Sequence, residues 1–208
     1  MANPLPKPLR DWCLKPPPEA LSTGLAEIDS ALGQIPRGAL TEFCGPRSCG
    51  RTSLLLATLA AATARQEVCA LVDSSDAFDP ESAAAAGVDL GRLLWVRCGG
   101  NAGHALKSAE WLAHGGGFGV LVLDLADLDT HRLPFTVWFR LQRAVEHTRT
   151  ALVVIDREPS ARTSASLVFS LSRERVAWQG VLEAAVVRIE RRKPLRAAAA
   201  TFEARAVA

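Results

Sequence analysis

The sequence has no uninterrupted apolar run that approaches the ~20 residues needed to span a bilayer. Its first residues, Met-Ala-Asn-Pro, also lack the apolar stretch of a secretion signal. We therefore expect a cytoplasmic protein without membrane contact. Apolar residues make up 49% of the 208 residues and charged residues 22%, which is the balance of a soluble globular protein.

The sequence also lacks the cysteine and histidine patterns of a metal site. It has five cysteines, but none form a C-x-x-C pair and no histidine cluster accompanies them, which predicts no zinc or other metal centre. An odd number in a cytoplasmic chain indicates free thiols, mostly buried. Cys49 would lie near a helix N-terminus, where a thiol pKa falls, so a redox role and a buried thiol both stay open for it. The cysteines are Cys13, Cys44, Cys49, Cys69 and Cys98.

The charge balance is nearly even, and a formal net charge of +2 does not by itself indicate nucleic-acid binding. Its distribution is less even, because residues 157 to 196 hold nine Arg or Lys against four Glu. This segment is either a solvated edge or a surface that meets an anionic partner, DNA or an acidic protein. The candidate contact residues are Arg157, Arg162, Arg173, Arg175, Arg191 and Arg192.

The pattern along the chain predicts an arm followed by one domain. Six prolines in residues 1–20 predict an extended arm, and residues 21–208 predict a single domain. After a short helix that ends at Leu32, apolar strands alternate with helices, which predicts a mostly parallel sheet covered on both faces. Three later strand-like segments without helices between them predict added antiparallel strands, with Ala197 to Ala200 as a turn. The expected strands are 40–44, 68–73, 93–98, 119–125, 151–156, 167–176, 182–191 and 201–207, and the expected helices are 52–64, 81–86, 102–114 and 133–147.

A glycine-rich loop, Gly45-Pro46-Arg47-Ser48-Cys49-Gly50-Arg51-Thr52, lies between a predicted strand and a predicted helix. Glycines at both ends let several backbone N–H groups point at one anion, and the helix adds its positive N-terminal end. The Thr52 hydroxyl and Asp124, at the end of an apolar strand, are candidates for organising magnesium. The usual lysine of this loop is Arg51, which is bulkier, planar and differently directed. We expect phosphate or nucleotide binding to survive this change but not fast hydrolysis, and no cofactor to be required.

Several short strings together resemble the opening of the bacterial RecA core. They include Leu21-Ser22-Thr23-Gly24, Pro36-Arg37-Gly38 and the loop itself, and continue through Leu71-Val72-Asp73 and Asp79-Pro80. Val120-Leu121-Val122-Leu123-Asp124 resembles the family's Walker B strand. The resemblance implies a RecA-like α/β fold with a phosphate loop, ATP and magnesium as the ligands of that loop, and a link to DNA repair.

The sequence departs from this family at four chemically distinct positions. Ser75 stands where the family has a water-activating glutamate, with Asp76 adjacent. Ser82 replaces an adenine-stacking tyrosine, and the chain has no tyrosine at all. Arg157 replaces a glutamine that senses the γ-phosphate, and Arg51 replaces the lysine. Losing a water-activating base alone costs on the order of 10²–10⁴-fold in rate, so we interpret the chain as a pseudo-ATPase without catalytic residues.

Among shortened RecA relatives, the chain most resembles the ImuA family, accessory factors of damage-induced (SOS) translesion mutagenesis. This resemblance implies a partnership with RecA, with an ImuB-type inactive Y-family polymerase and with an error-prone DNA polymerase, and weak DNA binding by the arginines is a further expectation. Two alternatives stay open: a slow ATP-dependent recombinase paralogue that works on DNA, and a SulA-like inhibitor of cell division.

Five tryptophans also need a place. We expect most of them in the core, with Trp12 in the arm and Trp138 as candidate interface anchors, because exposed aromatic side chains often carry binding energy. The four histidines are expected at the surface. They are His104, His114, His131 and His147, and the remaining tryptophans are Trp95, Trp111 and Trp178.

Overall fold

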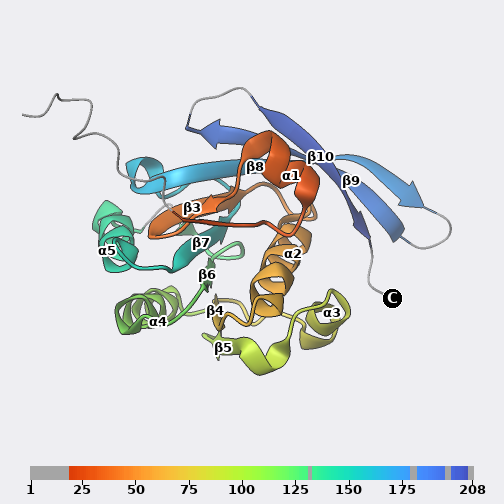
Figure 1. The fold of residues 1–208 in the computed structure, drawn as a ribbon. Coiled ribbons are helices and arrows are strands. Elements are labelled where there is room, and N and C mark those ends of the chain that lie inside the picture. Colours follow the sequence, from red (N-terminus) through yellow and green to blue (C-terminus); the bar gives the residue numbers. More distant parts are fainter. Residues whose placement is uncertain (1–18, 131–132, 179–181, 195–197, 206–208) are drawn as a thin grey trace, which may run out of the picture.

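The computed structural model describes residues 19–130, 133–178, 182–194 and 198–205, and Figure 1 shows their arrangement. A twisted eight-stranded sheet runs through the molecule in the order β10-β9-β8-β3-β7-β6-β4-β5. A separate two-stranded sheet joins β1 (Ala20–Leu21) to β2 (Ile35–Pro36). The α/β fold with a large, mostly parallel sheet flanked by helices agrees with the prediction.

Six neighbouring strands of the sheet are parallel, and all of them are short and apolar apart from the long β8. The central strands among them are buried on both faces, which explains their nearly continuous apolar sequences, whereas the edge strand β5 is partly exposed. In β6, for example, Val120 and Val122 face one core while Leu121 and Leu123 face the other. The six strands are β3 (Ala39–Cys44), β4 (Cys69–Asp73), β5 (Leu93–Arg97), β6 (Val120–Asp124), β7 (Ala151–Asp156) and β8 (Ala165–Trp178).

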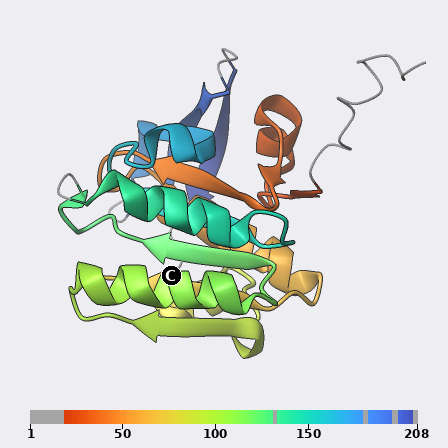
Figure 2. The same ribbon diagram turned by 90° about the vertical axis from the view of Figure 1, so that its left-hand side faces the viewer.

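Helices cover both faces of the sheet. On one face lie α2 (Arg51–Ala64) and α3 (Pro80–Ala85), together with α1 (Ala26–Leu32) near β9 and β10. On the other face α4 (Ala102–Gly115) and α5 (Phe135–Val145) lie side by side, as Figure 2 shows. No helix in the described ranges is long and apolar enough to cross a membrane.

The C-terminal strands refine one expectation. β8 pairs with β3 in parallel. The other two predicted additions form antiparallel pairs: β9 (Leu182–Lys193) with β8, and β10 (Ala199–Arg205) with β9. The chain passes from β7 to β8 through a short 3₁₀ turn, η4 (Arg162–Ser164), rather than a long helix. The predicted alanine turn was too long, because Ala199 and Ala200 already pair with Glu190 and Ile189.

The start of the domain is fixed by the carboxylate of Asp29 in α1. Its Oδ1 accepts hydrogen bonds from the amide and hydroxyl of Thr23, at 2.9 and 2.8 Å, and its Oδ2 accepts one from the Ser22 hydroxyl at 2.6 Å. Gly24 follows with φ 84°, and a Cβ there would lie 2.3 Å from the Ala57 carbonyl oxygen of α2. The Ser-Thr-Gly string therefore has a structural cause: only glycine fits between this turn and α2.

Candidate nucleotide-binding site

The phosphate loop joins β3 to α2, at the edge of the sheet where the parallel strands end. Both of its glycines are required by close packing. A Cβ on Gly45 would lie 2.4 Å from the Leu171 carbonyl oxygen, and one on Gly50, where φ is 93°, would lie 2.5 Å from a methyl carbon of Val187. The loop is thus pressed between its own helix and strands β8 and β9.

Arg51, the substituted lysine position, is directed inward. The residue is 8% exposed, and its Nη1 donates a hydrogen bond of 2.7 Å to the carbonyl oxygen of Asp156 at the end of β7. The guanidinium therefore lies at the C-terminal end of β7, in contact with the main chain. A flexible ammonium would be free to follow a phosphate, whereas this planar group is already held by the protein.

Thr52 and Asp124, the two predicted magnesium-organising residues, line the same cavity of about 210 Å³. The Asp124 carboxylate accepts a hydrogen bond of 3.0 Å from the Ala126 amide. Burial raises the pKa of Asp124 to about 6, and the nearby carboxylates Asp73 and Asp127 act in the same direction. The cavity is smaller than the roughly 300–1,000 Å³ of common small-molecule pockets.

The residues present fit a phosphate group and a magnesium ion better than a whole nucleotide. Backbone amides of the loop, the Thr52 hydroxyl and the Asp124 carboxylate are the oxygen and N–H groups that a magnesium phosphate takes. At the other end of the cavity Ser82 offers no ring for a base, and its hydroxyl donates to the Asp79 carboxylate. The described residues include no cluster of three or more metal-ligating side chains.

Ser75 and Asp76, at the expected water-activating position, both make contacts with neighbouring residues. The Asp76 carboxylate accepts a hydrogen bond from the Gly99 amide at 3.2 Å and pairs with Arg97 at 3.0 Å, so it is held at the end of β5. The Ser75 amide is bound to the carboxylate of Asp73, 3.3 Å away. The carboxylate of Asp76 thus already has two partners at this point.

Asp127 was not among the predicted site residues. Its carboxylate pairs with two arginines beside the phosphate loop. Its Oδ1 pairs with Arg47 of the phosphate loop at 2.6 Å and with Arg157 at 3.1 Å. The hydrogen bond with Arg47, followed by that with Arg157, holds the pKa of Asp127 below its usual value. Arg157 also donates from Nε to the Ala126 carbonyl oxygen at 2.7 Å. Its guanidinium is therefore committed to the protein itself.

Glu42 is a second unpredicted residue and is fully buried in β3. Its Oε1 accepts hydrogen bonds from the amides of Ser160 and Ala161 at 2.7 and 2.8 Å, and burial raises the pKa of this carboxyl. Glu42 therefore ties the strand before the phosphate loop to the segment after β7. A charged residue inside an otherwise apolar strand was the only sequence signal for it.

A match to the RecA N-terminal domain covers residues 15–131, which is more than half of the chain. The chain belongs to the RecA family. Over 108 residues, or 51% of its length, it is 41% identical to Protein RecA of Allorhizobium ampelinum and 40% identical to those of Rhizobium rhizogenes and Brucella canis. The aligned stretch covers only 30% of each of these relatives, so the chain matches less than a third of their length.

The RecA match ends just after β6, and the predicted contact arginines lie beyond it. Their contacts within the protein differ. Arg191 was predicted as a partner contact, but its Nη1 donates to the Leu32 carbonyl oxygen at 2.7 Å and so caps α1. Arg192 pairs with Glu190 at 3.4 Å. Arg173 and Arg175 lie exposed on β8, where Arg173 lines a cavity of about 270 Å³ beside the phosphate loop, and Arg162 lies after β7.

The thiols follow the prediction of free, buried cysteines at every described position, namely Cys44, Cys49, Cys69 and Cys98; Cys13 lies outside the described residues. Burial raises the pKa of Cys49 despite its place beside the N-terminus of α2. A thiol that stays protonated is a poor nucleophile, so the redox interpretation of Cys49 loses its basis.

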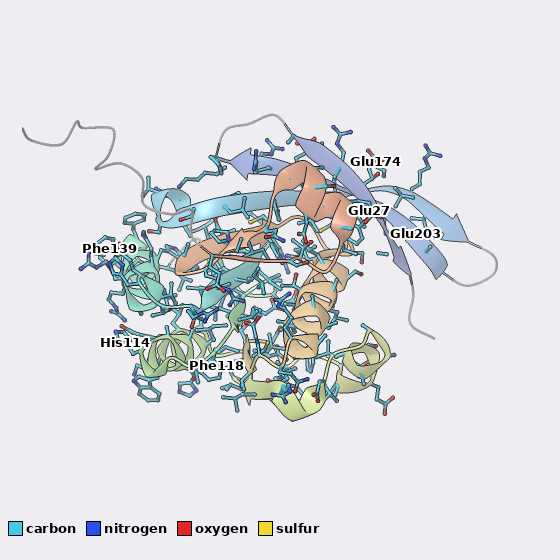
Figure 3. The ribbon with its side chains drawn as sticks, in the orientation of Figure 1. Glu27, His114, Phe118, Phe139, Glu174 and Glu203 are labelled. Atoms are coloured by element: carbon cyan, nitrogen blue, oxygen red, sulfur yellow. The ribbon has the colours of Figure 1, made fainter. Side chains whose placement is uncertain are left out.

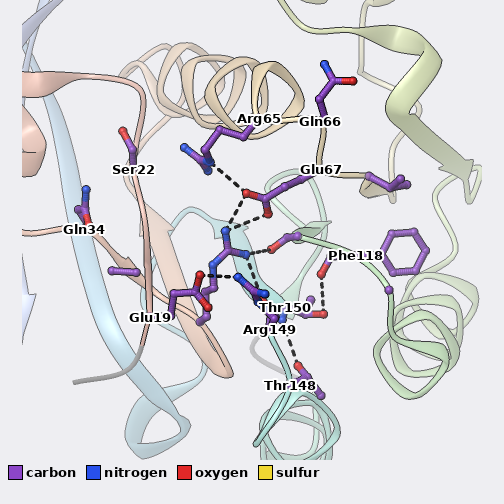
Figure 4. A pocket seen from close by; sticks show the side chains of 15 residues that line it. Glu19, Ser22, Gln34, Arg65, Gln66, Glu67, Phe118, Thr148, Arg149 and Thr150 are labelled. Atoms are coloured by element: carbon purple, nitrogen blue, oxygen red, sulfur yellow. Dashed lines mark hydrogen bonds and ion pairs between the residues drawn. The ribbon is translucent and has the colours of Figure 1, made fainter. Parts of the chain in front are cut away.

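A larger cavity, about 860 Å³, lies at the opposite edge of the sheet, where the parallel strands begin (Figure 4). Arg37 lines this cavity, and its Nη2 donates to both carboxylate oxygens of Glu67 at 2.8 and 2.9 Å. Its Nη1 donates to the carbonyl oxygens of Arg149 and Gly119, at 2.9 and 3.3 Å. Arg37 thus joins the starts of β3, β4, β6 and β7, which is a structural role.

Proposed function

We propose that this chain is a RecA-like accessory protein of the DNA-damage response and of translesion mutagenesis, resembling the ImuA family. It acts by binding other proteins: RecA, an ImuB-type inactive Y-family polymerase, or both, beside an error-prone DNA polymerase. It hydrolyses ATP very slowly or not at all, and works in the cytoplasm.

The observation that carries this proposal is the state of the phosphate loop. The phosphate loop keeps its two glycines, while the Arg51 guanidinium donates a hydrogen bond to the Asp156 carbonyl oxygen. Asp76 is held by Arg97, and so no carboxylate replaces the family's water-activating glutamate at this point. A fold that keeps the shape of a phosphate site without its reactive groups favours binding over turnover.

The alternative is a slow ATP-dependent recombinase paralogue, which the RecA relatives also allow. Thr52 and Asp124 share a cavity, as that alternative requires. A SulA-like division inhibitor is the second alternative, and it would bind the tubulin-like division protein instead of RecA.

The deciding experiment measures ATP turnover by the purified chain with and without single-stranded DNA, and RecA strand exchange with the chain added at stoichiometric amounts. We expect background turnover in both conditions and reduced strand exchange. A Thr52→Ala variant is the matched control, because Thr52 is exposed and its loss removes a candidate magnesium ligand without disturbing the core.

The accessory role predicts that the Thr52→Ala variant reduces RecA strand exchange to the same extent as the unaltered chain. DNA-stimulated turnover that Thr52→Ala abolishes would instead establish the paralogue. An unchanged RecA reaction, together with selective capture of purified division protein, would favour the division inhibitor.

A further inference from the structure

Strands β8, β9 and β10 extend the sheet beside the phosphate loop, and one arginine of this extension shares a cavity with the loop. The cavity has a volume of about 270 Å³. Figure 3 shows the extension, on which Glu174 of β8 and Glu203 of β10 are labelled. The cavity is lined by Arg173 of β8, by Ala185 and Val187 of β9, by Ala204 of β10, and by the loop and the start of α2 from Ser48 to Ser53.

A β-bulge decides which arginine of β8 faces the loop. Arg173 lies opposite Val187 of β9. Arg175 lies opposite the adjacent residue Val186, so Glu174 is an extra residue in the pairing. Cross-strand partners share a face of the sheet and successive residues of a strand face opposite sides, so the bulge places the two arginines on opposite faces. Val187 is buried in the core on the side of α2, and Arg173 is therefore the arginine on the face beside the loop.

The side chain of Arg173 is exposed and is not engaged by the protein. Within the described part of the chain its guanidinium makes no hydrogen bond or ion pair. Other arginines of the extension differ, since Arg188 pairs with the carboxylates of Glu174 and Glu190 at 3.4 and 3.0 Å. Arg192 pairs with Glu190 at 3.4 Å. These carboxylates thus neutralise other arginines, and the charge of Arg173 stays available to a ligand.

The loop side of the cavity offers N–H groups without acceptors. Helix α2 has 14 residues and no side-chain cap at its N-terminus, so the amides of its first turn have no partner within the helix. The dipoles of the helix make this end favourable for an anion. Arg51, which begins the helix, is held by the Asp156 carbonyl and does not supply a mobile cation. Arg173 supplies one from β8, and a guanidinium matches the oxygens of a phosphate with two parallel hydrogen bonds.

This cavity meets the one that holds Thr52 and Asp124, because Arg51 and Thr52 line both. The volumes, about 270 and 210 Å³, are each below the roughly 300–1,000 Å³ of pockets that enclose a small organic ligand. A chain of two or three phosphates is narrow and extended, so it suits two small cavities that are joined at the start of α2. Asp124 lines one of the two cavities and Arg173 lines the other.

We propose that Arg173 binds a phosphate group of a diphosphate or triphosphate chain on the phosphate loop, as the mobile cation that the buried Arg51 does not provide. This inference rests on the proposed function, in which the loop binds phosphate without turning it over. The chain of phosphates is either inorganic or the tail of a nucleotide, and both present the same groups to Arg173.

The test measures the affinity of inorganic triphosphate and of ATP, each with magnesium, by isothermal titration of three proteins. They are the unaltered chain, an Arg173→Ala variant and an Arg175→Ala control, which removes the same charge from the same strand on the other side of the bulge. Thermal unfolding of all three checks that each is folded. We expect Arg173→Ala to weaken both ligands at least about tenfold, the usual loss for a hydrogen bond between charged groups. The control should weaken them less than about threefold, because salt screens a charge that does not touch the ligand.

An Arg173→Lys variant separates charge from geometry. It keeps the cation but loses the paired donors of the guanidinium, so its affinity should lie between those of the unaltered chain and Arg173→Ala. If ATP binds more tightly than inorganic triphosphate and both depend on Arg173, the ligand is a nucleotide. Equal affinities with the same dependence identify the inorganic chain. Either result supports the role of Arg173.

Equal losses in the two alanine variants would show a diffuse effect of charge and overturn the role of Arg173. Failure of the unaltered chain to bind either ligand would overturn it as well, and would leave the accessory role intact, because binding to other proteins requires no ligand on the loop. DNA-stimulated hydrolysis of ATP would instead overturn the accessory role, while a selective loss of affinity in Arg173→Ala would still support this inference.

Discussion

A mostly buried arginine lies at each end of the parallel strands of the central sheet, and the two arginines have different hydrogen-bond partners. At the edge where the strands begin, Arg37 pairs with the Glu67 carboxylate and with two carbonyl oxygens. At the edge where they end, Arg51 donates to the Asp156 carbonyl, and no carboxylate of the described chain lies within ion-pair distance of it. The first charge is neutralised by a carboxylate inside the protein, whereas the second is held by a neutral carbonyl group and is not neutralised.

Because of this difference, the larger of the two cavities is not the candidate functional site. The cavity around Arg37 is the larger of the two, about 860 Å³, but its arginines are already paired with glutamates: Arg37 and Arg65 with Glu67, and Arg149 with Glu19. The cavity beside Arg51 is about 210 Å³ and brings Thr52 and Asp124 together. The smaller cavity is therefore the candidate site, because ligand binding and catalysis depend on polar groups that are not already paired rather than on the volume of the cavity.

The comparison predicts its largest effect at Arg37. Arg37→Ala leaves the partly buried Glu67 without its bidentate partner, and breaking such a pair costs about 3 kcal/mol of the free energy of unfolding. Arg65→Ala is the control, since Arg65 meets the same carboxylate at 3.0 Å but is 41% exposed, and an exposed pair contributes less than about 1 kcal/mol. Guanidinium unfolding measures both. Similar losses for the two variants would contradict the structural role assigned to Arg37.

The second prediction concerns Asp124 at the other edge. Because burial raises its pKa to about 6 in the folded protein, the ionised carboxylate destabilises the fold above pH 6. Asp124→Asn should therefore stabilise the protein by about 1–3 kcal/mol at pH 8. The gain should shrink as the pH falls from 6 towards 4, where the carboxyl of the folded protein takes up its proton. Unfolding at pH 8 and pH 4.5, with exposed Glu158→Gln as the control, checks this; a variant less stable at pH 8 would contradict it.

How much of this site the sequence could predict depends on the range of the interactions. The phosphate loop, its strand and its helix follow from a local spacing, and the pairing of β6 with β4 and β7 places Asp124 beside the loop as expected. The direction of Arg51 and the bridge made by Asp127 depend on residues 80 to 105 positions away in sequence. No local pattern encodes such contacts.

The tryptophans show a signal that the sequence did contain. Trp111 was expected in the core with most of the others, yet Ala105, Ala109 and Ala113 form a stripe at four-residue spacing that faces the sheet. A tryptophan two residues from such a stripe points the opposite way. Trp138 was misjudged for the converse reason, since it shares a side of α5 with Leu141 and Val145.

A third and smaller effect is expected at Arg51 itself. Arg51→Lys loses the contact with the Asp156 carbonyl and should lower stability by about 1 kcal/mol. The same change frees a cation to follow a bound phosphate, so we expect tighter binding of a fluorescent ATP analogue with hydrolysis still at background, because Ser75 supplies no base. Titration and turnover assays measure the two effects. Recovery of fast hydrolysis by this single change would show that the lysine alone was missing.

The smallest effect is expected at Asp127, where the pairs are exposed. Its partners Arg47 and Arg157 have side chains 72% and 47% exposed, and such ion pairs contribute at most about 1 kcal/mol, so Asp127→Asn should leave stability nearly unchanged. It should still strengthen the binding of inorganic triphosphate, because a carboxylate no longer competes with the ligand for these arginines. Isothermal titration at low and high salt measures this, since the gain must weaken as salt screens the charges. Unchanged affinity would mean that Arg47 and Arg157 do not reach the ligand, and that the available charge at this edge is Arg51 alone.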